Sequence, residues 1–351
     1  MQGRAAGAAA AMMVALAIPA TADAATKTVQ AGPFGAALER FSTAAGDANQ
    51  YFRGKVTIHR GDKVKWNING FHSVTFVPKG EPPPGLITPD AANPVSGQND
   101  AAGAAFFFNG LPNLNLNLAA ATPQGGDTLD PAVLTSSGLP LAEGPPEPYT
   151  LEFPKTGTYT YLCTVHPGMD AKVKVVKPGR PIPSAKKDRK AAKKELAKAL
   201  KKTEQLSAGQ GTGDLQNAIQ AGNDRAGGAT VFKFFPASAT VKAGDAITLQ
   251  MPPSSSEVHS FTFGPEAYLT GIADTLLGPV FNPIGAYPSD PPGTAHTPGL
   301  HGNGFWNSGL LDSDEATPNP QSTQVAFAAA GTFGYICIIH PFMKGSVTVT
   351  Q

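Results

Sequence analysis

The chain has 351 residues, with 27 Lys and Arg against 26 Asp and Glu, so its formal net charge is +1. The hydrophobic content of 41% excludes wholesale disorder, and the near-zero charge gives no support for nucleic-acid binding. Gly (39) and Pro (33) are over-represented, which favours a loop-rich fold over a helical bundle. The length predicts two domains, and the presence of only two cysteines excludes a disulfide-stapled scaffold.

Residues 1–24 have the order of a secretory signal peptide. Arg4 precedes an Ala-rich apolar run that ends at Pro19, and residues 22–24 form a small-x-small cleavage site. The run is shorter than the ~20 apolar residues of a membrane-spanning helix, so no transmembrane anchor is expected. We therefore expect a secreted or periplasmic protein, in an oxidising compartment where two unpaired cysteines need a function.

The mature chain is predicted to be all-β. Segments with alternating polar and apolar residues, rich in Val, Ile, Thr and aromatics, are separated by glycine turns, which is typical of a two-sheet sandwich. Long Pro/Gly/Asn-rich inserts interrupt the pattern at 78–148 and 264–320, and inserts of that length tend to be functional or mobile. The predicted strands before the linker are Lys55–Ile58, Lys63–Asn67, Ser73–Val77, Tyr149–Phe153, Thr158–Cys163 and Ala171–Val176.

A basic helical linker is predicted between the two halves. The segment 184–203 carries nine basic and two acidic residues, and its apolar residues recur at helical spacing: Ala192, Leu196, Ala199 and Leu200. One interpretation is a solvated helical spacer. The other is a basic face that binds an acidic partner or an anionic surface.

The two halves are related by an internal repeat, whose blocks occur in the same order. Gly157–Met169 matches Gly331–Met343 without a gap, Phe71–Phe76 matches Val258–Phe263, and Arg60–Trp66 matches Ala243–Leu249. Two copies indicate tandem domains rather than a solenoid. The predicted organisation is a signal peptide at 1–24, a first domain at 25–178, a Lys-rich helical linker at 179–227 and a second domain at 228–351.

Each copy places His, Cys, His and Met in one order. A thiolate and two imidazoles give a trigonal site, and a thioether adds a weak axial bond, a set that suits copper cycling between Cu(I) and Cu(II). The cysteine ends a strand, the second histidine lies in the turn and the methionine opens the next strand, so one loop presents three ligands. Two copper ions per chain are expected, on His72, Cys163, His166 and Met169 and on His259, Cys337, His340 and Met343.

The motif Cys-x2-His-Pro-x-Met, with an upstream His-Ser-x-Thr-Phe, resembles the cupredoxins, and within them the plastocyanin and amicyanin group. The resemblance implies two Greek-key sandwiches of eight strands, type 1 blue copper and one-electron transfer with a redox partner that the sequence does not identify. It also implies that Ser73 and Ser260 tie the first ligand strand to the cysteine loop. The inserts before the cysteines are longer than in small plastocyanins, and the first is longer than the second, so partner docking is expected to differ.

Two-domain cupredoxins also include nitrite reductases and small laccases, which hold a second type of copper centre. These enzymes need a His-x-His pair and a histidine adjacent to the type 1 cysteine, and the chain has neither. Outside the ligand sets only His59, His296 and His301 remain. His59 is interpreted as a surface residue, and the other two as part of a flexible loop or a weak accessory metal site. No catalytic residue is expected.

Two further hypotheses keep the copper ligands but change their use. In one the chain sequesters or delivers copper, and in the other its copper is structural in an extracellular interaction protein. A Cys163–Cys337 disulfide and a zinc site compete with copper, although methionine is an uncommon zinc ligand. A further matched pair, Phe108–Gly110 with Trp306–Gly309, suggests loop packing or an apolar docking rim.

Overall fold

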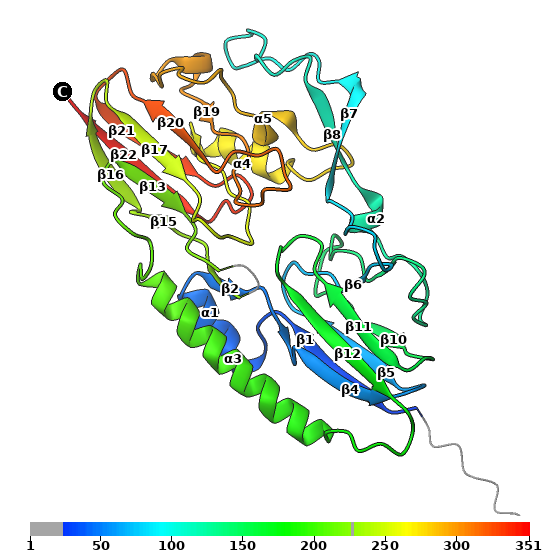
Figure 1. Cartoon of the computed structure of the whole chain (residues 1–351). Coiled ribbons are helices and arrows are strands. Elements are labelled where there is room, and N and C mark those ends of the chain that lie inside the picture. The colour runs from blue at the N-terminus through cyan, green and yellow to red at the C-terminus, as the bar shows by residue number, and fades with distance from the viewer. Residues whose placement is uncertain (1–23, 226–227) are drawn as a thin grey trace, which may run out of the picture.

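The computed structural model describes residues 24–225 and 228–351, so the predicted signal peptide lies outside the described residues except for Ala24. The described chain is mostly β, as expected, and forms two β-sandwiches with one long helix, α3 (Ala185–Ser207), running beside them (Figure 1). No helix of the described residues is long and apolar enough to cross a bilayer.

The first sandwich packs two sheets, with strand orders β10-β5-β1-β3 and β4-β12-β11-β6-β9. Alternate residues of each strand point inward, so Trp66 and Leu151 from one sheet meet Tyr161 and Val173 from the other in a fully buried core. The strands are β1 (Thr26–Ala31), β3 (Tyr51–Phe52), β4 (Lys55–His59), β5 (Lys63–Ile68), β6 (Thr75–Phe76), β9 (Thr135–Ser136), β10 (Tyr149–Glu152), β11 (Gly157–Leu162) and β12 (Asp170–Val176).

The second sandwich has sheets with orders β15-β13-β17-β20 and β16-β22-β21-β18-β19. Its core also joins inward residues of both sheets, such as Leu249 and Tyr335. The strands are β13 (Ala218–Ala221), β15 (Phe234–Phe235), β16 (Ser238–Lys242), β17 (Ala246–Gln250), β18 (Thr262–Phe263), β19 (Trp306–Asn307), β20 (Ser322–Ala326), β21 (Gly331–Ile336) and β22 (Lys344–Thr350).

Two details of the second sandwich differ from the expectations drawn from the sequence. β13 belongs to its sheet, although it lies within the stretch assigned to the linker, because the Gly/Gln/Asn-rich composition around it hides a four-residue strand. The match of Phe108–Gly110 with Trp306–Gly309 is wrong. β19 pairs with β18 as β9 pairs with β6, so the counterpart of Trp306–Gly309 is Thr135–Gly138.

The two sandwiches are joined by a small antiparallel sheet of β2 (Gly46–Ala48) and β14 (Ala229–Val231). Asp47 lies opposite Thr230 at its centre. The two strands occupy equivalent places, since each precedes the strand, β3 or β15, that pairs with β1 or β13. The junction is therefore approximately two-fold symmetric about the Asp47–Thr230 pair.

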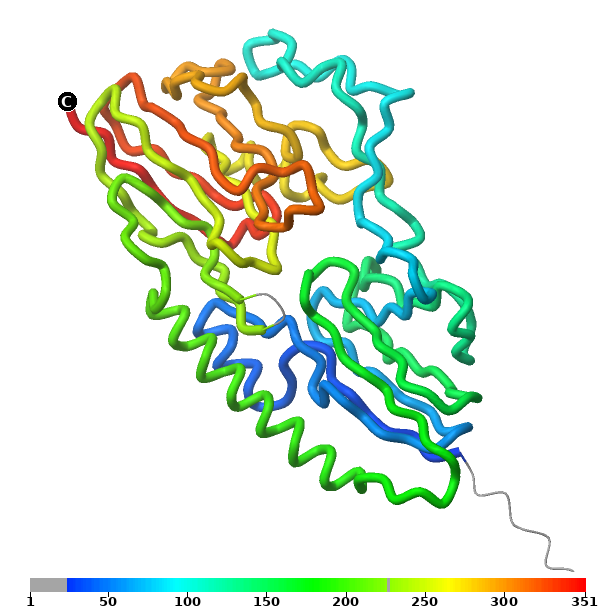
Figure 2. Tube along the Cα trace, in the orientation of Figure 1, coloured from blue at the N-terminus to red at the C-terminus, as the bar shows by residue number. Residues whose placement is uncertain are grey.

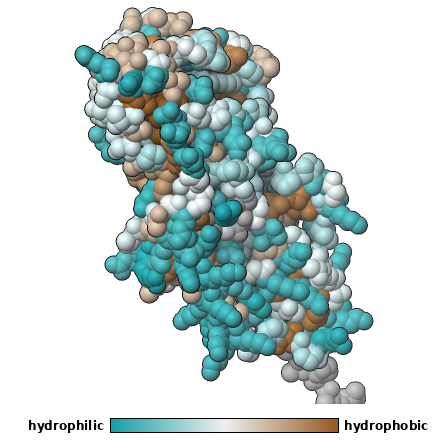
Figure 3. Space-filling view, turned by 60° about the vertical axis from the view of Figure 1, so that its left-hand side comes forward, coloured by the Kyte–Doolittle hydropathy of each residue, from teal (hydrophilic) through white to brown (hydrophobic). Residues whose placement is uncertain are grey.

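α3 packs along the first sandwich and reaches the second (Figure 2). The Ser184 side chain caps its start by accepting from the Lys187 N–H, and the predicted apolar stripe is buried against Phe41 and Phe52. Asp188 pairs with Lys27 at 2.7 Å and with Arg53 at 3.3 Å. The helix is therefore a packed element with a free outer face. Figure 3, with the side that bears α3 turned forward, shows hydrophilic side chains gathered over the lower half of the molecule.

The first insert forms an arm, residues 87–116, whose hairpin lies beside the second sandwich (Figure 1). The hairpin comprises β7 (Ile87–Pro94) and β8 (Pro112–Leu116). Phe106 and Phe108 from the arm are buried among Leu269, Ile272 and Phe305 of the second insert. The remaining short elements are η1 (Gly35–Ala37), α1 (Leu38–Thr43), α2 (Leu118–Ala121), α4 (Glu266–Asp274), α5 (Pro283–Ala286) and η2 (Leu300–Gly302).

Candidate metal centres

The first candidate centre lies where the β11–β12 loop meets the segment before β6. The ring nitrogens His72 Nδ1 and His166 Nδ1 are 3.0 Å apart, and Cys163 Sγ lies 3.4 Å from His166 Nδ1. All three ligand atoms lie within 4.8 Å of one another. The side chains are buried, so the structure brings these three predicted ligands to one enclosed point.

The second candidate centre repeats this arrangement in the other sandwich. Cys337 Sγ lies 3.6 Å from His259 Nδ1 and 3.7 Å from His340 Nδ1, and the two nitrogens are 3.2 Å apart. A point equidistant from the three atoms lies about 2 Å from each, close to the ~2.0–2.3 Å of metal bonds to imidazole nitrogen and thiolate sulfur. The residues present therefore fit a metal ion.

The two predicted axial ligands are buried beside the cysteines. Met169 and Met343 are 1% and 2% exposed and belong to the same core clusters as Cys163 and Cys337. The loop places each of them through its backbone, because the cysteine N–H donates to the methionine carbonyl at 3.0 Å in the first centre and 3.1 Å in the second. The backbone of each predicted axial ligand is thus held beside the backbone of its cysteine.

Burial sets the protonation of the ligands. It lowers the pKa of His72 and of His340 to about 4, and the pKa values of His166 and His259 well below the usual range, so the imidazoles are neutral and able to bind a metal. It raises the thiol pKa of both cysteines. A buried thiolate at such a point needs a cation to stabilise it.

The serines that follow the first histidines connect the two ligand segments. Ser73 N and Ser260 N lie 3.4 Å from the sulfur atoms of Cys163 and Cys337. The serine hydroxyls accept from the N–H of the residue after each cysteine, at 3.0 Å in the first centre and 2.8 Å in the second. These bonds orient the thiolate and tie its loop to the segment that leads into the neighbouring strand of the same sheet, β6 or β18.

Sequence reasoning missed a pair of glycines against which the first histidines pack. A Cβ added at Gly32 would lie 2.9 Å from His72 Nε2, and one at Gly222 would lie 2.7 Å from His259 Nε2. Both glycines have positive φ, at +85° and +73°. The repeated Gln-Ala-Gly at 30–32 and 220–222 was the signal that would have found them.

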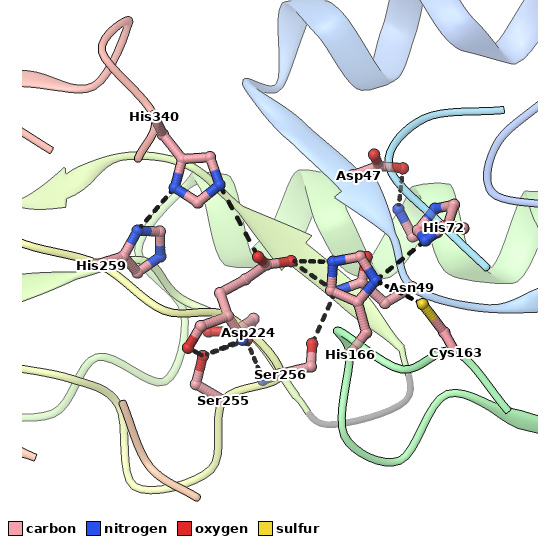
Figure 4. A network of polar contacts seen from close by, with 12 residues as sticks. Asp47, Asn49, His72, Cys163, His166, Asp224, Ser255, Ser256, His259 and His340 are labelled. Carbon is pink, nitrogen blue, oxygen red and sulfur yellow. Dashed lines mark hydrogen bonds and ion pairs between the residues drawn. The ribbon is translucent and has the colours of Figure 1, made fainter. Parts of the chain in front are cut away.

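The second missed residue is Glu257, which lies between the two centres. Its Oε1 is 3.6 Å from His166 Nε2 and its Oε2 is 3.9 Å from His340 Nε2. The Asn49 amide donates to Oε1 at 2.6 Å. Figure 4 shows His166 and His340 on opposite sides of this polar network, which also contains Asp224, Ser255 and Ser256. Burial raises the pKa of Glu257 well above its usual range, and the Asn49 hydrogen bond opposes that rise.

The remaining histidines lie in separate contacts. His59 Nε2 contacts the Arg180 carbonyl oxygen at 2.9 Å, and His296 is buried with its Nε2 2.9 Å from the Gly304 carbonyl oxygen. His301 lies between Asp100 of the arm, at 2.9 Å, and Asp290 of the second insert, at 3.1 Å. His296 and His301 therefore hold a packed insert, whereas the sequence pattern favoured a flexible loop or a metal site. The competing alternative of a Cys163–Cys337 disulfide is excluded, because both cysteines are free.

Comparison with known proteins gives structural neighbours only. No family model matches the chain, and no curated protein matches it. Among solved structures, a reduced amicyanin variant is 18% identical over 39% of this chain and 84% of its own, with a TM-score of 0.23. A second amicyanin variant in its reduced state is 19% identical over 41% of this chain and 88% of its own, with a TM-score of 0.22. The chemistry of the two centres is therefore inferred from this chain's own residues.

Proposed function

We propose that the protein is an exported electron carrier of the cupredoxin type, with a type 1 copper centre in each sandwich. The observation that carries the proposal is the convergence, twice, of two imidazole nitrogens and one cysteine sulfur on one buried point. Copper bound there supplies a one-electron Cu(I)/Cu(II) couple. The eight residues that would hold the two ions are His72, Cys163, His166, Met169, His259, Cys337, His340 and Met343.

Enclosure of the ligands favours electron transfer over the other candidate functions. Cys163 and Cys337 are 4% and 0% exposed, so neither sulfur atom is open to a substrate or to an acceptor protein. Among residues 24–225 and 228–351, the only groups of three or more potential metal ligands are these two. This distribution supports a carrier rather than copper delivery or a multicopper oxidase.

The test is copper loading of the full mature chain, with metal counted and spectra recorded. We expect about two copper ions per chain and an intense visible band from thiolate-to-Cu(II) charge transfer, because each ion is bound by one cysteine sulfur. Cys163→Ser and Cys337→Ser should each remove about half of the band and one ion. A colourless Cu(II) form would contradict the proposal.

A matched pair of histidine variants checks that the loss is specific to the ligands. His166→Gln should lose the first centre's band, whereas His59→Gln, a histidine of the same sandwich outside the centre, should keep both ions and the full spectrum. Rapid transfer of copper from the wild-type chain to a metal-free acceptor, with slow electron exchange, would support copper delivery instead.

A further inference from the structure

We propose that Glu257 is a positioning residue shared by both centres, whose two carboxylate oxygens accept the Nε2–H of His166 and of His340 and so couple the centres. The inference rests on the proposed function, because it requires that each imidazole binds copper through Nδ1. It adds to that function an internal connection through which the state of one centre influences the other.

The orientation of the imidazole rings determines which nitrogen of each ligand faces Glu257. In the second centre both Nδ1 atoms face the cysteine sulfur, at 3.6 and 3.7 Å, and lie 3.2 Å from each other. In the first centre the two Nδ1 atoms are 3.0 Å apart, and His166 Nδ1 lies 3.4 Å from the sulfur. An imidazole that binds a metal through Nδ1 carries its proton on Nε2 and donates it to a neighbouring acceptor, which fixes the ring. For His166 and His340 that acceptor is the same side chain, at 3.6 Å and 3.9 Å. These distances exceed an N–H···O hydrogen bond of ~2.7–3.2 Å by less than about 1 Å.

Counting donors identifies the chemistry that the position requires. Three N–H groups are directed at Glu257, one each from Asn49, His166 and His340. In its ionised form the carboxyl group has two oxygens with about four lone-pair sites and no donor, so it can accept all three. The positive charge of a copper ion bound in either centre would favour this form against the burial that raises the pKa of Glu257. A glutamine would present an NH2 group to one of the imidazoles and leave that ring without an acceptor. The carboxylate at 257 is therefore the group that serves both rings.

Departure from two-fold symmetry explains why one residue serves both centres. The residue two before His72 is Gly70, which is the counterpart of Glu257 before His259. Gly70 has φ +89°, and a Cβ there would lie 3.3 Å from Asp47 Oδ2 and 3.5 Å from His72 Nε2. A side chain at this position of the first copy would be strained by the positive φ and would crowd the Asp47 carboxylate. Glu257, 6% exposed, reaches from the second sandwich across the junction to His166.

A shared acceptor makes the centres interdependent. An imidazole bound to Cu(II) is a stronger donor than one bound to Cu(I), because the ion draws more charge from the ring. With copper bound, oxidation of one centre would therefore favour the approach of Glu257 to that centre's histidine and disfavour its approach to the other. We expect the second oxidation to be less favourable than the first, so the two potentials depend on each other's state.

The experiment compares Glu257→Gln with Glu266→Gln in the full copper-loaded chain. Glu266 is an exposed glutamate of the same sandwich, paired with Lys344. In the Cu(I) form, which is diamagnetic, imidazole N–H resonances report the Nε2 hydrogen bonds of His166 and His340. Glu257→Gln should move both resonances and should raise the potential measured for each centre alone in the Cys337→Ser and Cys163→Ser backgrounds. Glu266→Gln should move neither.

A second measurement leaves Glu257 intact. Emptying the first centre with Cys163→Ser should shift the His340 N–H resonance and the potential of the second centre relative to the wild type. No shift there, or a Glu257→Gln effect confined to one centre, would overturn the assignment. A wild-type chain that takes up no copper would overturn the proposed function together with this inference. A blue wild-type chain with two copper ions, whose N–H resonances and potentials stay unchanged in the Glu257→Gln and Cys163→Ser variants, would overturn the inference alone.

Discussion

The two candidate centres share their ligands and differ in what surrounds them. Around the first, Asn49 and Gly168 occupy the positions that Phe232 and Phe342 occupy around the second, as the strand registers and the matched loops show. Asn49 donates to Glu257, whereas the Phe232 ring packs 4.7 Å from the His340 ring. The inner geometry of the two centres is alike, while the next layer has specialised in each copy.

Access to the histidines follows this difference. The His166 side chain is 9% exposed and the His340 side chain 18%, with Phe342 beside it 64% exposed. The first centre is enclosed by the junction, and the second reaches the surface at an apolar rim. Under the proposed function, this asymmetry predicts that electrons enter and leave mainly through the second centre, and substitutions around each centre can test it.

The largest effect is expected from filling the space between Gly32 and His72 and the equivalent space between Gly222 and His259. Gly32→Ala and Gly222→Ala place a methyl group 2.9 Å and 2.7 Å from the imidazole Nε2, so each should lose copper from its own centre. Gly32→Ala should also unfold more easily, because its Cβ clashes with the Asn69 carbonyl oxygen. Metal counting, visible spectra and urea unfolding measure the two losses.

Matched glycines separate this clash from backbone strain. Gly61 and Gly244 have φ of +89° and +91° and open space around the added Cβ. Their alanine variants should cost only the ~1–2 kcal/mol of a left-handed residue and keep both centres. Copper loss in these controls as well would show that backbone strain rather than crowding of the imidazole controls the centres.

The next effect concerns the arm, which only the first copy possesses. Phe106→Ala or Phe108→Ala should each lower the free energy of unfolding by about 3–5 kcal/mol, because each removes a buried ring of the arm that packs against the second insert. Phe107→Ala is the matched control, since its ring is 44% exposed. Thermal unfolding followed by circular dichroism gives the values. Equal effects at all three positions would contradict this packing of the arm.

The smallest effect is expected in the rates at which an external reductant reduces the two copper centres. A small hydrophilic reductant should reduce the second centre, isolated by Cys163→Ser, faster than the first centre, isolated by Cys337→Ser. Phe342→Gly gives the second loop the residue that the first loop has at this position, Gly168. It should raise the reduction rate of the second centre and leave that of the first unchanged. Stopped-flow loss of the blue band measures both rates, and equal rates would remove the asymmetry of access.

Local patterns predicted the ligands and the sandwiches, because these depend on short-range signals. The ligand pattern from Cys163 to Met169 lies within a few consecutive residues, and strands are recognised by the alternation of polar and apolar residues. Glu257 has no such signal, since its role depends on residues about 90 and 80 positions away in sequence that only the junction brings close. The strand β13 lies in a Gly/Gln/Asn-rich stretch and the arm in a Pro/Gly/Asn-rich one. Both were missed for a related reason, because such a composition indicates a loop whatever the segment packs against.

The arm also imposes an order on biosynthesis. Phe106 and Phe108 are made long before Leu269, Ile272 and Phe305, the residues that bury them. Until residues 266–305 have followed, two aromatic rings have no surface to cover them, and a partly made chain is prone to self-association. A fragment that ends at the linker lacks residues 266–305, so its Phe106 and Phe108 rings would stay uncovered. The halves look separable in sequence, yet they must mature as one molecule.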